Sequence, residues 1–421
     1  MSTLGEKYHA VLLHGARVGT LCQKGDYTRF VFNESYLDDP HRPVLGLRFE
    51  ENLRSPYASA LRLPKWFSNL LPEGPLREWI AQDRGVSLDR EMELLAQVGH
   101  DLPGAVQVLP AESPDEDWEW AEGDGPDVSG GAYSFPTDSP WRFSLAGVAL
   151  KFSMLAQGDR LTAPAAGVHG DWLVKFPDHR HSDVPRNEFT MMSLARAVGI
   201  DAPDVRLVHR DELDGVPPRM WPNGEEWAYA VRRFDRLPES SRTSVHIEDF
   251  AQVRDKYPHA KYEGSFETVV ALAYRGQDTA ALSEAVRRIA FCTVIGNGDA
   301  HLKNWSLIYR DRRVPTLSPA YDLVSTAPYA PTGEPEDLGL SFGRSKRFAD
   351  VRTATFKQLQ DRLNHRLGHI DTDLAAIAEE TATRVREHWP EYEEGLAVNP
   401  DLRSEVGEWI ATYTQVLLAG P

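Results

Sequence analysis

The sequence predicts an α+β protein, on the basis of three observations. Short apolar runs typical of strands recur through the first half of the chain, whereas residues 246–421 carry longer segments with helical periodicity. A polar loop, Gly296 to Asn304, separates an apolar helical run from a strand pattern. We therefore expect four parts, which are residues 1–110, 111–140, 141–245 and 246–421.

Composition limits the class of protein. Among 421 residues, 41% are hydrophobic and 26% charged, as in ordinary globular proteins, and the net charge is −17. Such an acidic surface repels phosphate backbones, so we expect DNA contact only through a partner. No apolar run approaches the ~18 residues of a membrane span, and the start lacks a secretory signal. Two cysteines predict neither a disulfide framework nor a zinc site, so we expect a cytoplasmic protein with no membrane contact.

Residues 1–110 are predicted to form a small α/β subdomain. The stretch from Gly15 to Gly25 is expected to be a turn between two strands. The expected strands are Lys7–Leu13, Thr28–Phe32, Pro43–Phe49 and Gly104–Leu109, and the expected helices are Leu76–Gln82 and Asp89–Val98.

Residues 111–140 differ in composition. Eight acidic and no basic residues lie between Ala111 and Asp127, and glycines and prolines follow, so a flexible acidic linker is expected.

Residues 141–245 are predicted to form a strand-rich lobe. A strand pattern from Trp141 to Leu155 is interrupted by Gly147, and a glycine allows close approach of a backbone to phosphates. An ordinary hairpin would show the same pattern. Lys175 ends a short apolar strand, and Glu188 follows 13 residues later in the first turn of an amphipathic helix. This placement suits a lysine–glutamate ion pair, although the helix dipole alone also favours Glu188.

The last predicted strand of this lobe runs into a charged segment that ends at Arg236, where an inter-lobe hinge would lie.

The final part, residues 246–421, is predicted to be helical. Its expected helices are His246–Val253, Phe266–Tyr274, Ala281–Ile295, Asp350–Leu367, Ala375–Trp389 and Asp401–Leu418.

The loop after Ile295 carries the residues that point to chemistry. Asp299 and Asn304 lie five residues apart, and Asp322 follows 23 residues after Asp299. This set resembles a protein-kinase active site, in which one carboxylate takes the proton of the acceptor hydroxyl. Amide and carboxylate oxygens are suitable ligands for magnesium. A polar loop capped by Asp and Asn would explain any single residue, but it explains the three together less well.

At this point the chain resembles the HipA family of serine/threonine kinases, the toxins of bacterial toxin–antitoxin pairs. The motifs that carry the resemblance are Asn69–Pro75, Leu94–Pro110, Val231–Arg236, Gly296–Asn304 and Ser318–Leu323. The resemblance implies a bilobal protein-kinase-like fold with an N-terminal α/β subdomain, and an activity that uses ATP and Mg²⁺. At position 149 the family commonly has Gln where this chain has Ala149.

The resemblance also implies roles for individual residues. Asp299 would be the catalytic base, and Asn304 and Asp322 would be the metal ligands. Family members inactivate themselves by phosphorylating a loop serine, a place held by Ser144, with Ser153 as a weaker candidate. The ATP-binding residues would be Lys175, Glu188, Gly147, Val148, Arg233, Phe234 and His301.

The family further implies two kinds of partner. One is a HipB-like helix-turn-helix antitoxin, which would supply the contact with DNA. The other is a protein substrate from translation, with an aminoacyl-tRNA synthetase as the best guess. Two alternatives remain at the level of sequence: a small-molecule phosphotransferase on the same fold, and a catalytically silent module that binds the antitoxin.

Overall fold

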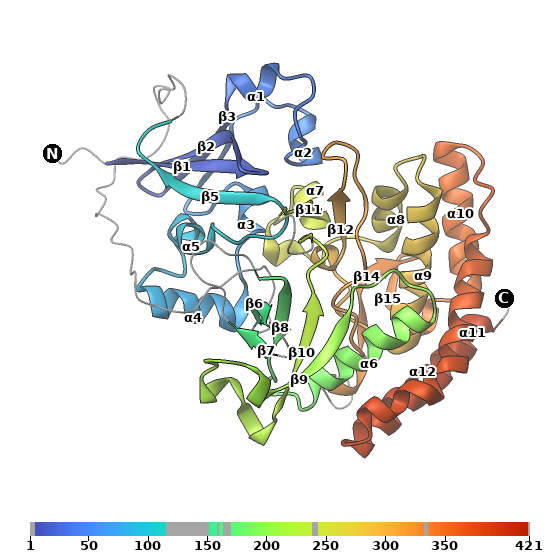
Figure 1. Ribbon diagram of the computed structural model, residues 1–421. Coiled ribbons are helices and arrows are strands. Elements are labelled where there is room, and N and C mark those ends of the chain that lie inside the picture. The colour runs from blue at the N-terminus through green and yellow to red at the C-terminus, as the bar shows by residue number, and fades with distance from the viewer. Residues whose placement is uncertain are drawn as a thin grey trace. The chain divides into compact units, whose positions relative to one another are not determined.

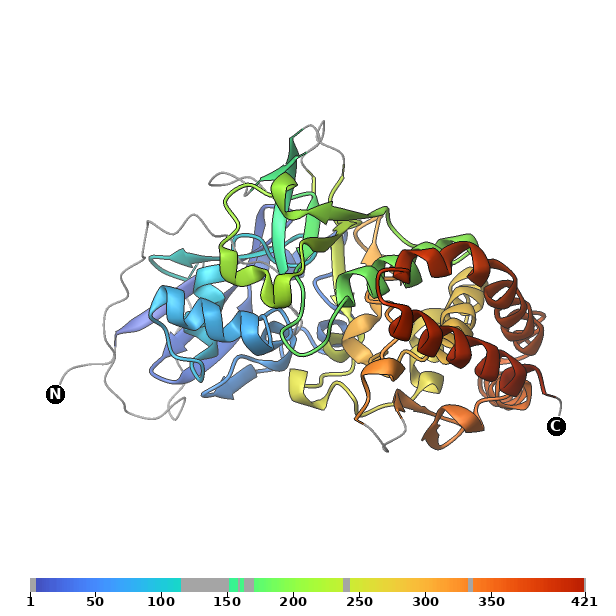
Figure 2. The ribbon, with the colours of Figure 1, turned by 90° about the horizontal axis from the view of Figure 1, so that it is seen from below.

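The computed structural model describes residues 5–114, 151–157, 160–162, 170–237, 243–331 and 336–419. Its chain divides into two compact units, each built from separate stretches of sequence. Unit 1 comprises Met1–Val174, Arg233–Ala260 and Ile308–Pro315, and unit 2 comprises Lys175–Arg232, Lys261–Leu307 and Thr316–Pro421. Figures 1 and 2 show the elements from two directions. The four-part division of the sequence stays a prediction.

Unit 1 contains a five-stranded antiparallel sheet with the order β4-β3-β2-β1-β5 (Figure 1). Its strands are β1 (Glu6–Leu13), β2 (Ala16–Lys24), β3 (Tyr27–Phe32), β4 (Tyr57–Ala60) and β5 (Val106–Ala111). The predicted turn between Gly15 and Gly25 is wrong, because β2 occupies most of it. The reversal instead needs only His14 and Gly15, whose φ angles of 52° and 80° suit a two-residue hairpin turn.

The other elements of unit 1 are mostly short. They are α1 (Glu34–Asp38), α2 (Leu47–Glu50), α3 (Lys65–Ser68), α4 (Gly74–Arg84), α5 (Glu91–Val98), β6 (Lys151–Gln157), β7 (Arg160–Thr162), β11 (His246–Asp249) and α7 (Phe250–Val253). β8 (Trp172–Lys175) ends where unit 2 begins. Aromatic rings fill the core of unit 1; the ring of Phe30 lies 4.6 Å from that of Phe32 and 4.8 Å from that of Phe67.

Two predictions for unit 1 are corrected. The expected strand Pro43–Phe49 is wrong, because this segment leads into α2 and the amide of Leu47 donates to the distant Glu248 carboxylate at 2.9 Å. The expected helix His246–Val253 is half strand. Asp249 caps α7, since its carboxylate accepts from the Gln252 amide at 2.8 Å and the Gln252 side chain accepts from the Asp249 amide.

Unit 2 is largely helical. Its helices are α6 (Val184–Ala197), α8 (Phe266–Tyr274), α9 (Thr279–Ile295), α10 (Thr353–Leu367), α11 (Leu374–Tyr392) and α12 (Pro400–Leu418). Its strands are β9 (Val205–His209), β10 (Trp227–Arg232), β13 (Thr316–Leu317), β14 (Asp337–Phe342) and β15 (Ser345–Arg347), while β12 (Ser306–Tyr309) ends in unit 1. The helices expected in this region are confirmed to within a few residues. No helix in the described ranges is long and apolar enough to cross a membrane.

Helix α9 is the centre of unit 2. It packs against α8, α11 and α12, and its last five residues, from Phe291 to Ile295, are all buried. A helix enclosed on several sides is apolar all round, which explains the continuous apolar run in the sequence. The packing fixes the end of α9, and so fixes the point at which the loop with Asp299 begins.

Unit 1 also buries a carboxyl group, that of Glu248, which is 0% exposed. It accepts hydrogen bonds from the Leu47 amide at 2.9 Å, from Trp66 Nε1 at 3.2 Å and from the Tyr309 hydroxyl. Burial raises the pKa of Glu248 to about 7, although these hydrogen bonds act in the opposite direction. Between about pH 4.3 and about pH 7 the folded chain therefore holds a proton there that the unfolded chain has lost.

We predict that Glu248 makes unit 1 less stable as the pH rises. The pKa of a glutamate in an unfolded chain is about 4.3, so the folded state binds more protons between there and about pH 7. Over that window the free energy of unfolding should fall by at most about 1.4 kcal/mol per pH unit through this residue. Urea unfolding at several pH values should show a shallower fall in Glu248→Gln. Glu50→Gln removes a part-exposed carboxylate that pairs with Arg42 at 2.7 Å, and is measured in parallel to show the effect of removing a carboxylate that is not buried. An unchanged dependence in Glu248→Gln would contradict the raised pKa.

Candidate active site

The loop with Asp299 begins at a glycine that no other residue can replace easily. Gly296 ends α9 in the left-handed conformation, with φ +71°. A Cβ atom there would lie 2.7 Å from Trp409 Nε1 and 2.8 Å from the Ala327 Cβ. Both the left-handed conformation and the lack of room for a Cβ atom require glycine at this position. The direction in which the loop leaves α9 is therefore fixed.

Hydrogen bonds within the loop then fix the backbone of Asp299. Its amide donates to the Asn297 side chain at 3.0 Å. Its carbonyl accepts from Asn304 Nδ2 at 2.7 Å and from the His301 amide at 2.8 Å. The side chain of Asp299 is 48% exposed. Asp299 and Asn304 are therefore brought together, with the carboxylate accessible to a substrate.

A second group of charges gathers around Lys175, at the end of β8. Its ammonium group lies 2.6 Å from Glu188 Oε1 and also pairs with the Asp322 carboxylate. Glu188 was expected in the first turn of its helix, but it is the fifth residue of α6, because the helix begins at Val184. Burial alone would lower the pKa of Lys175, but Asp322 and Glu188 outweigh burial and raise it. Lys175 is therefore charged, and three residues that the sequence predicted separately form one cluster.

Asp322 has an unusual backbone. Its φ angle is +56°, in the left-handed region that residues other than glycine rarely adopt. Asp322 and Asn304 line the same pocket, together with Asn297 and Ala300. Carboxylate and amide oxygens at one pocket suit Mg²⁺, which takes few protein ligands and completes its shell with phosphate and water oxygens. No group of three His, Cys, Asp or Glu side chains suited to a metal occurs among the described residues.

The remaining predicted residues are placed as follows. His301 is buried, and its Nε2 lies 3.8 Å from Asp299 Oδ1, beyond hydrogen-bonding distance. Gly147, Val148 and Ser144 lie outside the described residues. Phe234 is half-buried, next to Arg233.

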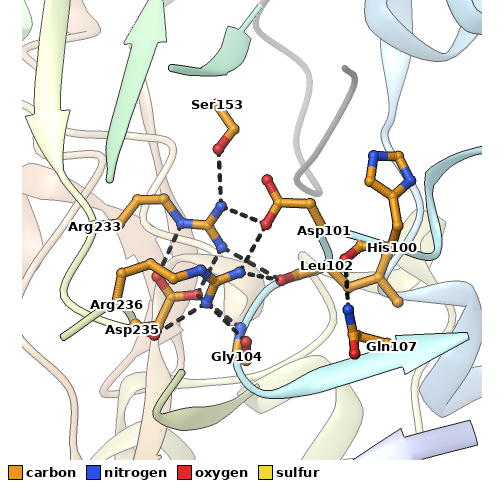
Figure 3. A network of polar contacts seen from close by, with 9 residues as sticks. All are labelled: His100, Asp101, Leu102, Gly104, Gln107, Ser153, Arg233, Asp235 and Arg236. Carbon is orange, nitrogen blue, oxygen red and sulfur yellow. Dashed lines mark hydrogen bonds and ion pairs between the residues drawn. The ribbon is translucent and has the colours of Figure 1, made fainter. Parts of the chain in front are cut away.

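Arg233 belongs to a buried network of two arginines and two aspartates in unit 1 (Figure 3). It donates to both oxygens of Asp235, at 3.0 and 2.9 Å, and to Asp101 Oδ1 at 3.0 Å. Arg236 donates to Asp101 Oδ1 and to Asp235 Oδ2, both at 2.8 Å. The guanidinium of Arg233 thus binds protein carboxylates, and its amide donates to the Asp171 carbonyl at 2.8 Å.

The network balances its own charges. Burial acts to raise the pKa of Asp235, but Arg233 and Arg236 outweigh burial and hold the pKa below its usual range. Ser153, which is 1% exposed, accepts from Arg233 at 3.1 Å. A buried hydroxyl that is already hydrogen-bonded cannot easily reach a phosphoryl donor, so the structure disfavours Ser153 as a phosphorylation site.

Three residues near the predicted site were missed by sequence reasoning. The hydroxyl of Tyr262 donates to Asp299 Oδ1 at 2.5 Å. The ring of the fully buried Tyr229 lies 5.7 Å from the Lys175 ammonium. Burial raises the pKa of Glu336, which accepts from the Thr326 hydroxyl at 3.1 Å and feels the charge of Asp299. Tyr229 lies in a predicted strand, but no periodicity or motif marks Tyr262 or Glu336 as neighbours of Asp299.

Comparison with known proteins identifies the family. Residues 143–389 match the HipA-like C-terminal domain, and residues 9–109 match the HipA N-terminal domain. The chain belongs to the HipA family. A Sinorhizobium fredii protein named as a kinase is 42% identical over 420 residues, which cover 96% of this chain and 95% of that protein.

Two Shewanella oneidensis comparisons agree with this family. The serine/threonine-protein kinase toxin HipA is 28% identical over 288 residues, which cover 62% of either chain. The solved complex of HipA, HipB and operator DNA contains a chain that matches with a TM-score of 0.73 and 20% identity, covering 97% of both chains. This likeness confirms the predicted α+β, kinase-like fold of the HipA proteins.

We predict that removal of one carboxylate from the buried network strongly destabilises unit 1. Asp235→Asn would leave two buried guanidinium groups with one carboxylate, which typically costs about 3–5 kcal/mol. Asp255→Asn is the matched control, because Asp255 pairs with Lys65 at 2.9 Å in a part-exposed position and should cost at most about 1 kcal/mol. Urea unfolding measures both. Equal losses in the two variants would contradict the structural role of the network.

Proposed function

We propose that this protein is an ATP- and Mg²⁺-dependent serine/threonine protein kinase of the HipA type. The observation that carries the proposal is the cluster of Lys175, Glu188 and Asp322. Asn304 lines the same pocket as Asp322, and its side chain bonds to the backbone of Asp299. A charged lysine, two oxygen ligands and an accessible carboxylate are the groups that phosphoryl transfer to a hydroxyl needs.

In this proposal each side chain has one task. Asp299 orients the acceptor hydroxyl and accepts its proton. Lys175 has three N–H donors, so it can bind ATP phosphates while Glu188 holds it in place. Asn304 and Asp322 would hold Mg²⁺, which neutralises charge on the phosphates when it is bound. Catalysis rests on positioning and on compensation of charge. The resemblance also assigns nucleotide contacts to Gly147, Val148, Phe234 and His301. It assigns one to Arg233 as well, but the Arg233 guanidinium and amide already bind Asp101, Asp235 and the Asp171 carbonyl, so we leave Arg233 out of this proposal.

We also propose the biological setting of a toxin. The S. oneidensis homologue was solved with HipB and operator DNA, and we infer that this chain pairs with a HipB-like helix-turn-helix antitoxin. With a net charge of −17, the chain itself is poorly suited to DNA, so the antitoxin would make that contact. The protein substrate would be a translation component, with an aminoacyl-tRNA synthetase first among the candidates.

We predict that Asp299→Asn abolishes phosphoryl transfer. An amide cannot accept the proton of the acceptor hydroxyl, and loss of a general base typically costs about 10²–10⁴-fold in rate. Transfer of labelled γ-phosphate from ATP to protein measures the activity, and Mg-ATP binding is measured separately to show that the nucleotide site is intact. The exposed Asp361 on α10 provides the control, since Asp361→Asn should retain full activity. Transfer that persists in Asp299→Asn would refute the assignment of the base.

We further predict that the wild-type protein labels itself on Ser144 and becomes inactive. Mass spectrometry of peptides after incubation with ATP should find the phosphate on Ser144, and Ser144→Ala should stay active for longer. Asp299→Asn is the negative control. Efficient transfer to a small molecule, with no label on protein, would instead favour the small-molecule phosphotransferase. Failure to bind Mg-ATP would favour the silent antitoxin-binding module.

A further inference from the structure

The side chain of Tyr262 makes a direct contact with Asp299. Its hydroxyl donates to Asp299 Oδ1 at 2.5 Å, a short distance typical of a hydrogen bond to a carboxylate. Both residues belong to unit 2, but they lie 37 positions apart in the chain. Tyr262 is 41% exposed, so its contact with Asp299 lies where a substrate can reach it.

Two contacts of its ring and one hydrogen bond of the neighbouring backbone support Tyr262. Its ring packs edge-on against the buried His301, with ring centroids 5.0 Å apart. The ammonium group of Lys261 lies 5.5 Å from the centre of the ring. The carbonyl of Lys261 accepts from the Leu302 amide at 3.1 Å, which ties this segment to the loop that carries Asp299. The phenol is thus positioned on a supported ring and backbone.

We propose that Tyr262 is a positioning residue that fixes the carboxylate of Asp299 for phosphoryl transfer. The inference rests on the proposed kinase function. Hydrogen bonds from the loop fix the backbone of Asp299 but leave the rotation of its carboxylate open. The phenol holds one oxygen, and the other oxygen has lone pairs for the acceptor hydroxyl. Misorientation of a reacting group slows the chemical step, so loss of the Tyr262 hydroxyl should lower kcat.

The geometry disfavours the opposite role, in which Tyr262 occupies the place of the acceptor hydroxyl until a substrate displaces it. A placeholder must leave easily, whereas Tyr262 is held by His301, by Lys261 and by the hydrogen bond to the Asp299 loop. The two roles predict opposite changes. Removal of a positioning hydroxyl slows transfer, and removal of a placeholder speeds it.

The test is Tyr262→Phe, which removes the hydroxyl and keeps the ring with its contacts to His301 and Lys261. A hydrogen bond to a charged group accounts for a change of about tenfold or more, so kcat for transfer of γ-phosphate to protein should fall by that factor. The KM for Mg-ATP should stay within about twofold, because the nucleotide contacts are unchanged. Tyr257→Phe is the matched control, since the Tyr257 hydroxyl bonds to Ser59 at 2.9 Å, and this variant should keep the native kcat.

The outcomes separate this inference from the proposed function. A lower kcat with an unchanged KM and an unchanged melting temperature supports the positioning role. Native or faster transfer by Tyr262→Phe overturns it, and faster transfer identifies a placeholder. An equal loss in Tyr257→Phe also overturns it, because the effect would then be structural. If the wild-type protein binds Mg-ATP but transfers no phosphate, the proposed function fails first, and the positioning role fails with it.

Discussion

The ion pairs of Lys175 are the interaction on which the candidate site depends. Lys175 is 7% exposed, and burial of its ammonium group costs several kcal/mol unless carboxylates compensate. Here Glu188 comes from α6 and Asp322 from the loop after β13. The charge of one side chain therefore requires three separate segments of unit 2 to meet, and the same charge is what phosphates would bind.

The Arg233 network is a structural cluster, and it differs from the cluster around Lys175. Its two guanidinium groups and two carboxylates balance one another, and all four side chains are at least 93% buried. Planar, bidentate pairs of this kind fix geometry. Lys175 has a compact charge, and its partner Asp322 remains 28% exposed. A carboxylate with access to solvent can be replaced by another anion beside Lys175, so the arrangement suits ligand binding as well as stability.

The sequence predicted the helices of unit 2 and the members of the site because both leave local signals. Helical periodicity marks α8 to α12, and the spacings of Lys175, Glu188, Asp299, Asn304 and Asp322 follow a known chemical order. Contacts between distant residues leave no such signal. The turn expected before β3 is wrong because two residues suffice to reverse the chain, and α2 depends on Glu248, 201 positions from Leu47. Likewise, Asp101 could not be assigned to Arg233 from spacing alone.

Asp299 illustrates both cases in one residue. Its backbone is determined locally, since Gly296, Asn297 and Asn304 are near in sequence and each has a geometric reason to be there. Its carboxylate accepts a hydrogen bond from Tyr262, which reaches it from another segment of the chain. A motif therefore specifies which side chains the loop carries, but not the rotamer that a carboxylate adopts there. Tertiary contacts bear on that last degree of freedom, and for Asp299 the phenol hydroxyl of Tyr262 is such a contact within the described part of the chain.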